Sequence, residues 1–248
     1  MILKSIVLSA LAIAACGCVK SDKTPADRLL DCLNASVDAG KILYGHQDDL
    51  CYGHAWCVED PANDPLERSD VKDVCGKYPA MLGLELGEIE LGGPKSLDAV
   101  PFELIRRAAL KQVERGGVVT FSWHPRNPLT GDSAWDVSSD QVVASILEGG
   151  ENHAKFMGWL QIVGDFFETL RDADGKRIPF IFRPWHENTG SWFWWGRNSA
   201  RANSISPSGN LPSIIWRKSA ASTTSSGASP RTWMWMPTAI WSAIPATR

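Results

Sequence analysis

The sequence predicts an α/β fold built from parallel strands, and three observations support this. The 248-residue chain is 44% hydrophobic and 21% charged, a composition that gives a substantial core and excludes a wholly disordered protein. Apolar strand-like segments alternate with segments of helical apolar spacing, as in parallel βα units. Polar residues follow the strand-like segments: His46 to Asp49, Glu85 and Glu88, His124, and Arg183 to Glu187.

The individual elements follow from apolar periodicity and stop signals. Strands are predicted at residues 41–47, 78–85, 117–124 and 178–187. The third is almost entirely apolar, as expected for a strand covered on both faces. Helices are predicted at residues 26–39, 99–115 and 153–171. This pattern fits a (β/α)8 barrel or an open doubly wound sheet, although the absence of a GxGxxG loop after the first strand disfavours nucleotide binding.

Residues 1–15 are predicted to be a lipoprotein-type signal peptide. Lys4 gives a positive start, and the apolar run that follows is too short to span a bilayer. Ile13-Ala-Ala-Cys16 resembles a bacterial lipobox, so Cys16 is the expected acylation site and residues 16–25 the anchor and tether. The alternative is a plain secretory signal with a chance cysteine. We expect an exported lipoprotein in the periplasm or on the surface of a bacterium, touching the membrane through its lipid only.

Export to an oxidising compartment permits disulfides among the remaining cysteines. Cys32, Cys51, Cys57 and Cys75 allow three pairings, and Cys51 is close enough to Cys57 for a local bridge. A zinc site is the less favoured alternative, because the spacings lack a paired CxxC pattern. The net charge of -3 gives no reason to expect a nucleic-acid partner.

The stretch from Arg183 to Gly196 is the candidate site. Arg183, His186 and Glu187 stand at a strand end and are followed by a run rich in tryptophan. Aromatic faces stack on sugar rings, and a carboxyl desolvated by tryptophan acquires a raised pKa that suits a general acid. We therefore expect a carbohydrate cleft, lined by Trp123, Trp135, Trp185, Trp192, Trp194 and Trp195. The alternative is that the tryptophans form core and that Glu187 pairs with Arg183.

The site stretch and several other segments together resemble glycoside hydrolase family 26, the β-mannanase family of retaining (β/α)8 glycosidases. The other segments include Gly45-His-Gln-Asp-Asp49, Tyr78-Pro-Ala80, Leu86-Gly-Glu-Ile-Glu90, Gly117-Val-Val-Thr-Phe-Ser-Trp-His124 and Ser133-Ala-Trp-Asp136. The resemblance covers residues 41–197. It implies a (β/α)8 TIM barrel of which only the first half, strands 1–4, is clearly encoded, within a catalytic region at residues 26–198.

The resemblance also implies the chemistry. Glu187 would be the general acid/base, with His186 and Arg183 orienting the site. His124 and Trp192 would line the subsite of the cleaved mannose, and Trp135 is a weaker member of the substrate-binding set. The expected partner is a β-1,4-mannan polysaccharide or oligosaccharide, and no metal or organic cofactor is expected. Retention needs a second carboxylate roughly 5 Å from the first.

The region after the site departs from the family. The family nucleophile is a Glu on the seventh strand, but all 28 Asp and Glu residues of this chain lie at or before Glu187. The nucleophile is therefore expected to be absent. Residues 199–248 contain 16 Ser or Thr among 50 residues and are predicted to be a disordered or non-native tail.

A shift of reading frame near Ser199 would explain this tail. When the third base of each codon is read with the first two bases of the next codon, Trp233-Met-Trp-Met-Pro237 must encode D-V-D-A, because Trp and Met each have one codon.

The sequence leaves three alternative functions. The first is a mannan-cleaving enzyme, and the second is a family member that acts on β-glucan or xylan. The third is a non-catalytic truncated product, either a weak mannan binder or a misfolded chain.

Overall fold

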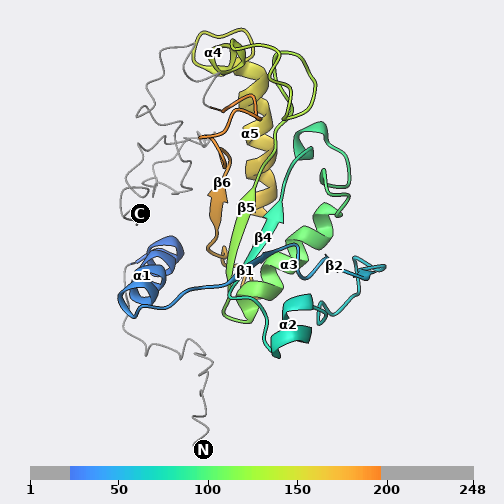
Figure 1. Cartoon of the computed structure of the whole chain (residues 1–248), viewed down its shortest axis with the longest axis vertical. Coiled ribbons are helices and arrows are strands. Elements are labelled where there is room, and N and C mark those ends of the chain that lie inside the picture. The colour runs from blue at the N-terminus through green and yellow to red at the C-terminus, as the bar shows by residue number, and fades with distance from the viewer. Residues whose placement is uncertain (1–22, 197–248) are drawn as a thin grey trace, which may run out of the picture.

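The structure is a computed structural model that describes residues 23–196 (Figure 1). The predicted signal peptide, Cys16 and the predicted tail at 199–248 lie outside the described residues. A four-stranded parallel sheet runs in the order β1-β4-β5-β6. Its strands are Gly45–Gln47, Met81–Glu85, Val118–Ser122 and Ile181–Arg183, each inside the segment predicted for it.

The strand order decides between the two architectures that the sequence allowed. All neighbours are parallel and follow one another in chain order, whereas a doubly wound sheet reverses its order at a switch point. The described residues thus form the first four strands of a (β/α)8 barrel, which confirms the predicted fold class.

The three predicted helices are present as α1 (Pro25–Asp38), α3 (Phe102–Glu114) and α5 (His153–Glu168). The loops add four shorter pieces: α2 (Asp70–Cys75), η1 (Ile89–Leu91), α4 (Val142–Ile146) and a hairpin of β2 (Tyr52–Gly53) with β3 (Trp56–Cys57). Across residues 23–196, none of these helices has the length and apolar character needed to cross a membrane.

The core lies on one face of the sheet. Strand residues that point toward α3 and α5 are fully buried: Leu82, Leu84, Val119 and Phe121. Phe121 packs its ring against those of Phe166, Phe167 and Phe180. On the opposite face, Gln47 and Arg183 are exposed and Thr120 is half-buried. On the third strand itself, Thr120 is half-buried and Ser122 is buried on this second face, so the predicted coverage of both faces is met only in part among the described residues.

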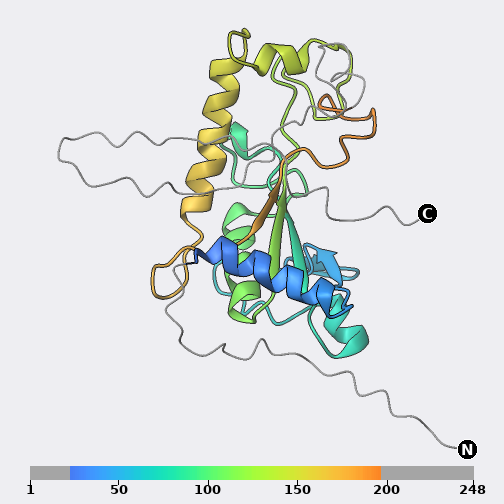
Figure 2. The same ribbon diagram turned by 90° about the vertical axis from the view of Figure 1, so that its left-hand side faces the viewer.

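Helix α1 lies across the end of the sheet where the strands begin (Figure 2). Thr24 caps it, and the Asp27 side chain accepts in return from the Thr24 backbone N–H, forming a capping box. None of its residues is buried. A hollow of about 980 Å³ separates α1 from α3 and from the segment that leads into β6. The helix is thus stabilised locally by its cap, with little burial against the sheet.

None of the pairings that the four cysteines allow is formed in the structure. Cys32, Cys51, Cys57 and Cys75 are all free thiols. The β2–β3 hairpin does bring the chain around Cys51 close to Cys57, because Tyr52 pairs with Cys57 in the ladder. Cys51 is nevertheless buried, and burial raises the pKa of its thiol. Within residues 23–196, no cluster of three His, Cys, Asp or Glu side chains is placed to hold a metal ion, so the zinc alternative gains no support.

Candidate active site

Three neighbouring strands bring a carboxylate and two histidines together at their carboxyl ends. Glu85 is the last residue of β4, His124 follows β5, and His186 follows β6. The Glu85 carboxylate is 2% exposed. Its Oε1 accepts from the backbone N–H groups of Gly87 at 2.5 Å and His124 at 2.9 Å, and its Oε2 accepts from Ser122 Oγ at 2.5 Å. Sequence reasoning placed Glu85 at a strand end but assigned it no role.

Glu85, His124 and His186 form a continuous polar chain, called here the Glu85–His124–His186 chain. His124 Nδ1 lies 3.0 Å from Glu85 Oε2, and His124 Nε2 lies 2.9 Å from His186 Nε2. Burial opposes ionisation of Glu85, but its contacts to His124 and Ser122 outweigh burial and lower the pKa of this carboxyl. Burial, helped by the adjacent His124, lowers the pKa of His186. At neutral pH the chain therefore combines an anionic carboxylate with a neutral outer imidazole.

Glu187 directly follows this chain and faces solvent. Its backbone has φ 55°, in the left-handed region that non-glycine residues seldom adopt. Its Oε2 accepts a hydrogen bond of 2.8 Å from Trp192 Nε1. The side chain is exposed, so the expected desolvation of Glu187 by surrounding tryptophan is not found among the described residues. The carboxyl is held by one indole donor at the edge of an open site.

Arg183 does not form the alternative ion pair with Glu187. Its Nε donates to Thr120 Oγ1 at 3.1 Å, across the face of the sheet that the helices leave open. The guanidinium is therefore anchored on the neighbouring strand, with its side chain exposed on the concave side of the half barrel. There it is available to orient a ligand, as the resemblance implied.

The tryptophan cluster divides into core and surface. Trp123, Trp194 and Trp195 are fully buried and Trp185 is 9% exposed, so these four rings are core and do not line a cleft. Trp135 and Trp192 are 47% and 51% exposed. Of the six tryptophans predicted to line the cleft, only these two are exposed enough to do so. They are the pair that the family resemblance assigned to substrate binding.

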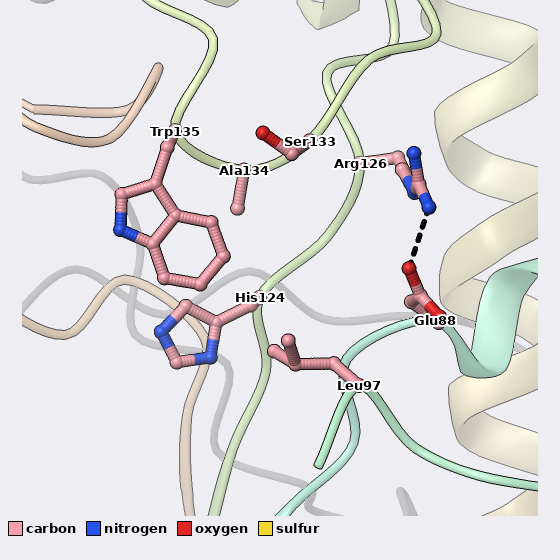
Figure 3. A pocket seen from close by; sticks show the side chains of 7 residues that line it. All are labelled: Glu88, Leu97, His124, Arg126, Ser133, Ala134 and Trp135. Atoms are coloured by element: carbon pink, nitrogen blue, oxygen red, sulfur yellow. Dashed lines mark hydrogen bonds and ion pairs between the residues drawn. The ribbon is translucent and has the colours of Figure 1, made fainter. Parts of the chain in front are cut away.

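Trp135 stacks on His124 with ring centroids 5.1 Å apart and planes at 12° (Figure 3). These two side chains, with Arg126 and its ion-pair partner Glu88 at 2.6 Å, line a pocket of about 60 Å³. Trp135 is therefore both an exposed ring and part of the lining of this pocket.

Further carboxyls stand beside Glu85 and were not assigned a role from the sequence. Asp48, just after β1, is fully buried and accepts from Tyr52 Oη at 3.3 Å. Burial and the neighbouring Asp98 raise the pKa of Asp48 to about 7. Burial also raises the pKa of Asp98, with Glu85 adding to the effect. The β1 and β4 side of the site thus collects acidic groups, and Asp48 changes charge near neutral pH.

Comparison with known proteins agrees with this geometry. The sequence matches the profile of Glycosyl hydrolase family 26 over residues 20–244. A mannan endo-1,4-β-mannosidase of Bifidobacterium adolescentis is 31% identical over 167 residues, which are 66% of this chain and 16% of that protein. One of Thermothelomyces thermophilus is 27% identical over 173 residues, 65% of this chain and 31% of that protein.

Solved structures give the same result. The GH26 β-mannanase BoMan26A of Bacteroides ovatus is 48% identical with a TM-score of 0.66, over 71% of this chain and 49% of that chain. An endo-β-1,4-mannanase of Cellulomonas fimi is 34% identical with a TM-score of 0.60, over 72% and 39%. This chain spans less than half of the length of each of these four relatives. The profile match, the strand order and the strand-end residues lead to one conclusion: the chain belongs to glycosyl hydrolase family 26.

Proposed function

We propose that the carboxyl end of the sheet is the proton-donating half of a site for β-1,4-mannosidic bonds. The observation that carries the proposal is the hydrogen bond from Trp192 Nε1 to Glu187 Oε2, which holds an exposed carboxyl beside an exposed aromatic face. The relatives named as mannan endo-1,4-β-mannosidases support mannan as the substrate class.

In this proposal Glu187 acts as the general acid/base. As an acid it gives its proton to the glycosidic oxygen while the bond to the anomeric carbon breaks. In a retaining reaction a second carboxylate about 5 Å away forms the bond to that carbon. Water then attacks the same carbon and gives its proton to Glu187, while the bond between the carbon and the second carboxylate breaks. No Asp or Glu follows Glu187 in this sequence. We therefore propose that a protein of this sequence binds mannan and cleaves it little or not at all.

The other residues would bind and orient the glycan. Trp192 and Trp135 offer ring faces for mannosyl rings, and the Arg183 guanidinium offers donors on the concave side of the sheet. Both ring nitrogens of His124 already face Glu85 and His186. His124 would therefore line the subsite with its ring and hold its neighbours, and would not donate to a sugar hydroxyl.

Release of reducing ends from galactomannan and glucomannan by the purified protein tests the catalytic proposal. We expect at most a trace, equal in the wild type and in Glu187→Ala, because proton donation alone does not complete retention. Robust turnover that is lost in Glu187→Ala would show that the chain is a competent enzyme and would refute the proposed inactivity.

The coding DNA across codons 195–202 provides the companion test. A protein translated from the restored reading frame should cleave mannan, and Glu187→Ala should abolish that activity. An uninterrupted frame with no insertion or deletion relative to close homologous genes would rule out the proposed frame shift.

We also propose that the protein is an exported lipoprotein acylated at Cys16. The support is the sequence Ile13-Ala-Ala-Cys16 after a short apolar run. Expression in a bacterium with radiolabelled palmitate should label the wild type and leave Cys16→Ser unlabelled. Equal labelling of both proteins would contradict the proposal.

A further inference from the structure

We propose that Glu85 is a positioning residue for the site, because it sets which nitrogens of His124 and His186 carry protons and so fixes the backbone that presents Glu187. The inference rests on the proposed function only in the role given to Glu187, the residue that is positioned. The proton arrangement itself is a property of the folded chain and is measurable without any substrate.

The contacts of Glu85 determine the first proton. Its Oε1 is occupied by the Gly87 and His124 backbone donors, so Oε2 faces both the Ser122 hydroxyl and the His124 ring. The anionic Oε2 lies 3.0 Å from His124 Nδ1, in a contact that lacks hydrogen-bond geometry, and its charge favours a proton over a lone pair on that nitrogen. In neutral His124 the Nε2 position is then a lone pair, ready to accept.

The second proton follows from His186. Two imidazole nitrogens 2.9 Å apart must share one proton, so His186 Nε2–H donates to His124 Nε2. The remaining nitrogen, His186 Nδ1, is buried and has no hydrogen-bond partner. Buried N–H groups without a partner are rare, which favours a bare nitrogen at that position. The opposite arrangement would place an unpartnered N–H there.

The chain ends on the backbone that carries the acid. Trp195 Nε1 donates to the His186 carbonyl oxygen at 3.0 Å, so His186 is held through both its ring and its backbone. The next residue, Glu187, adopts φ 55°, and such a conformation persists only where its surroundings impose it. Glu85 therefore acts on Glu187 at a distance, through two imidazoles.

Nitrogen-15 NMR of the whole protein labelled at histidine tests this directly, because protonated and bare imidazole nitrogens have well-separated shifts. The chain has five histidines, so single substitutions assign them. In the wild type at neutral pH we expect His124 protonated at Nδ1 and His186 protonated at Nε2. The opposite pattern at either residue would overturn the proposal, whatever the substrate proves to be.

Glu85→Gln should invert both tautomers. The two backbone donors require the amide oxygen at the Oε1 position, which turns the amide NH2 toward His124 Nδ1. That nitrogen must then lose its proton to accept, His124 Nε2 gains one, and His186 shifts its proton to Nδ1. The indole N–H resonance of Trp192 should move as well, because it reports the hydrogen bond to Glu187.

Glu90→Gln is the matched control. Glu90 is a buried carboxylate in η1 that accepts from Trp123 Nε1 at 3.0 Å and from the Arg126 backbone at 2.7 Å. The substitution Glu90→Gln also replaces a buried carboxyl close to the site by an amide. It should leave both tautomers and the Trp192 resonance unchanged. If Glu85→Gln preserves the wild-type pattern, or if Glu90→Gln inverts it equally, the positioning role is refuted. If Glu85→Gln does not fold, the wild-type tautomers still decide.

Discussion

At the scale of single residues, the charge state of Asp48 is the property most sensitive to conditions. This carboxyl is fully buried, and Asp98 adds to burial in raising its pKa to about 7. A raised pKa means that the folded state binds this proton more tightly than the unfolded state. The stability contributed by this group is therefore full below about pH 4 and is lost as the pH rises to about 7.

Asp48→Asn should remove this pH dependence. Relative to the wild type, we expect the variant to gain about 3 kcal/mol of unfolding free energy between pH 5 and pH 8. Urea titrations at the two pH values measure it. Asp49→Asn is the control: Asp49 accepts from Ser69 Oγ at 2.5 Å, so its loss should destabilise the protein at both pH values. Parallel pH profiles for wild type and Asp48→Asn would contradict the assignment.

The sequence predicted the residues of the site better than their roles. Glu187, His186, Arg183 and His124 were identified because they fall at strand ends and within a family motif. The role of Glu85 needed tertiary contacts, since its partner His124 lies 39 positions away. The separation of core tryptophans from surface ones also needed the structure. Within one loop, Trp192 is 51% exposed whereas Trp194 is fully buried.

At the scale of elements, periodicity and stop signals located the long pieces. The four strands and three main helices carry strong apolar patterns and were all predicted. The short pieces were missed because distant side chains stabilise them. Asp70 of α2 accepts from the His54 backbone and from Trp56 Nε1, and so joins α2 to the β2–β3 hairpin. No local pattern reveals such a contact.

Paired substitutions test the one-sided burial of the sheet. Phe121→Ala should cost about 3–5 kcal/mol of unfolding free energy, because Phe121 is fully buried among three phenylalanines. Ile42→Ala, just before β1, should change it by less than about 0.5 kcal/mol, because Ile42 is 95% exposed. Chemical denaturation measures both. A large cost at Ile42 would show that this side of β1 is covered in solution.

At the scale of the whole molecule, the described residues are half of a barrel in which α3 and α5 cover one face of the sheet. Strands β1 and β6 each have one neighbour in the described sheet, so each has an unpaired edge there. Exposed edges of this kind favour association with other strands. The site lies at the carboxyl end of this half barrel, where the side chains of Glu187, Trp192 and Arg183 are exposed.

Titration calorimetry with mannohexaose, cellohexaose and xylohexaose is the most direct test of the claim that this end of the sheet is a mannan site. We expect the protein to bind mannohexaose more tightly than either of the other two. Trp192→Ala should weaken that binding by about 1 kcal/mol through loss of an exposed ring face. Absence of mannohexaose binding, equal binding of all three, or binding unaffected by Trp192→Ala would contradict it.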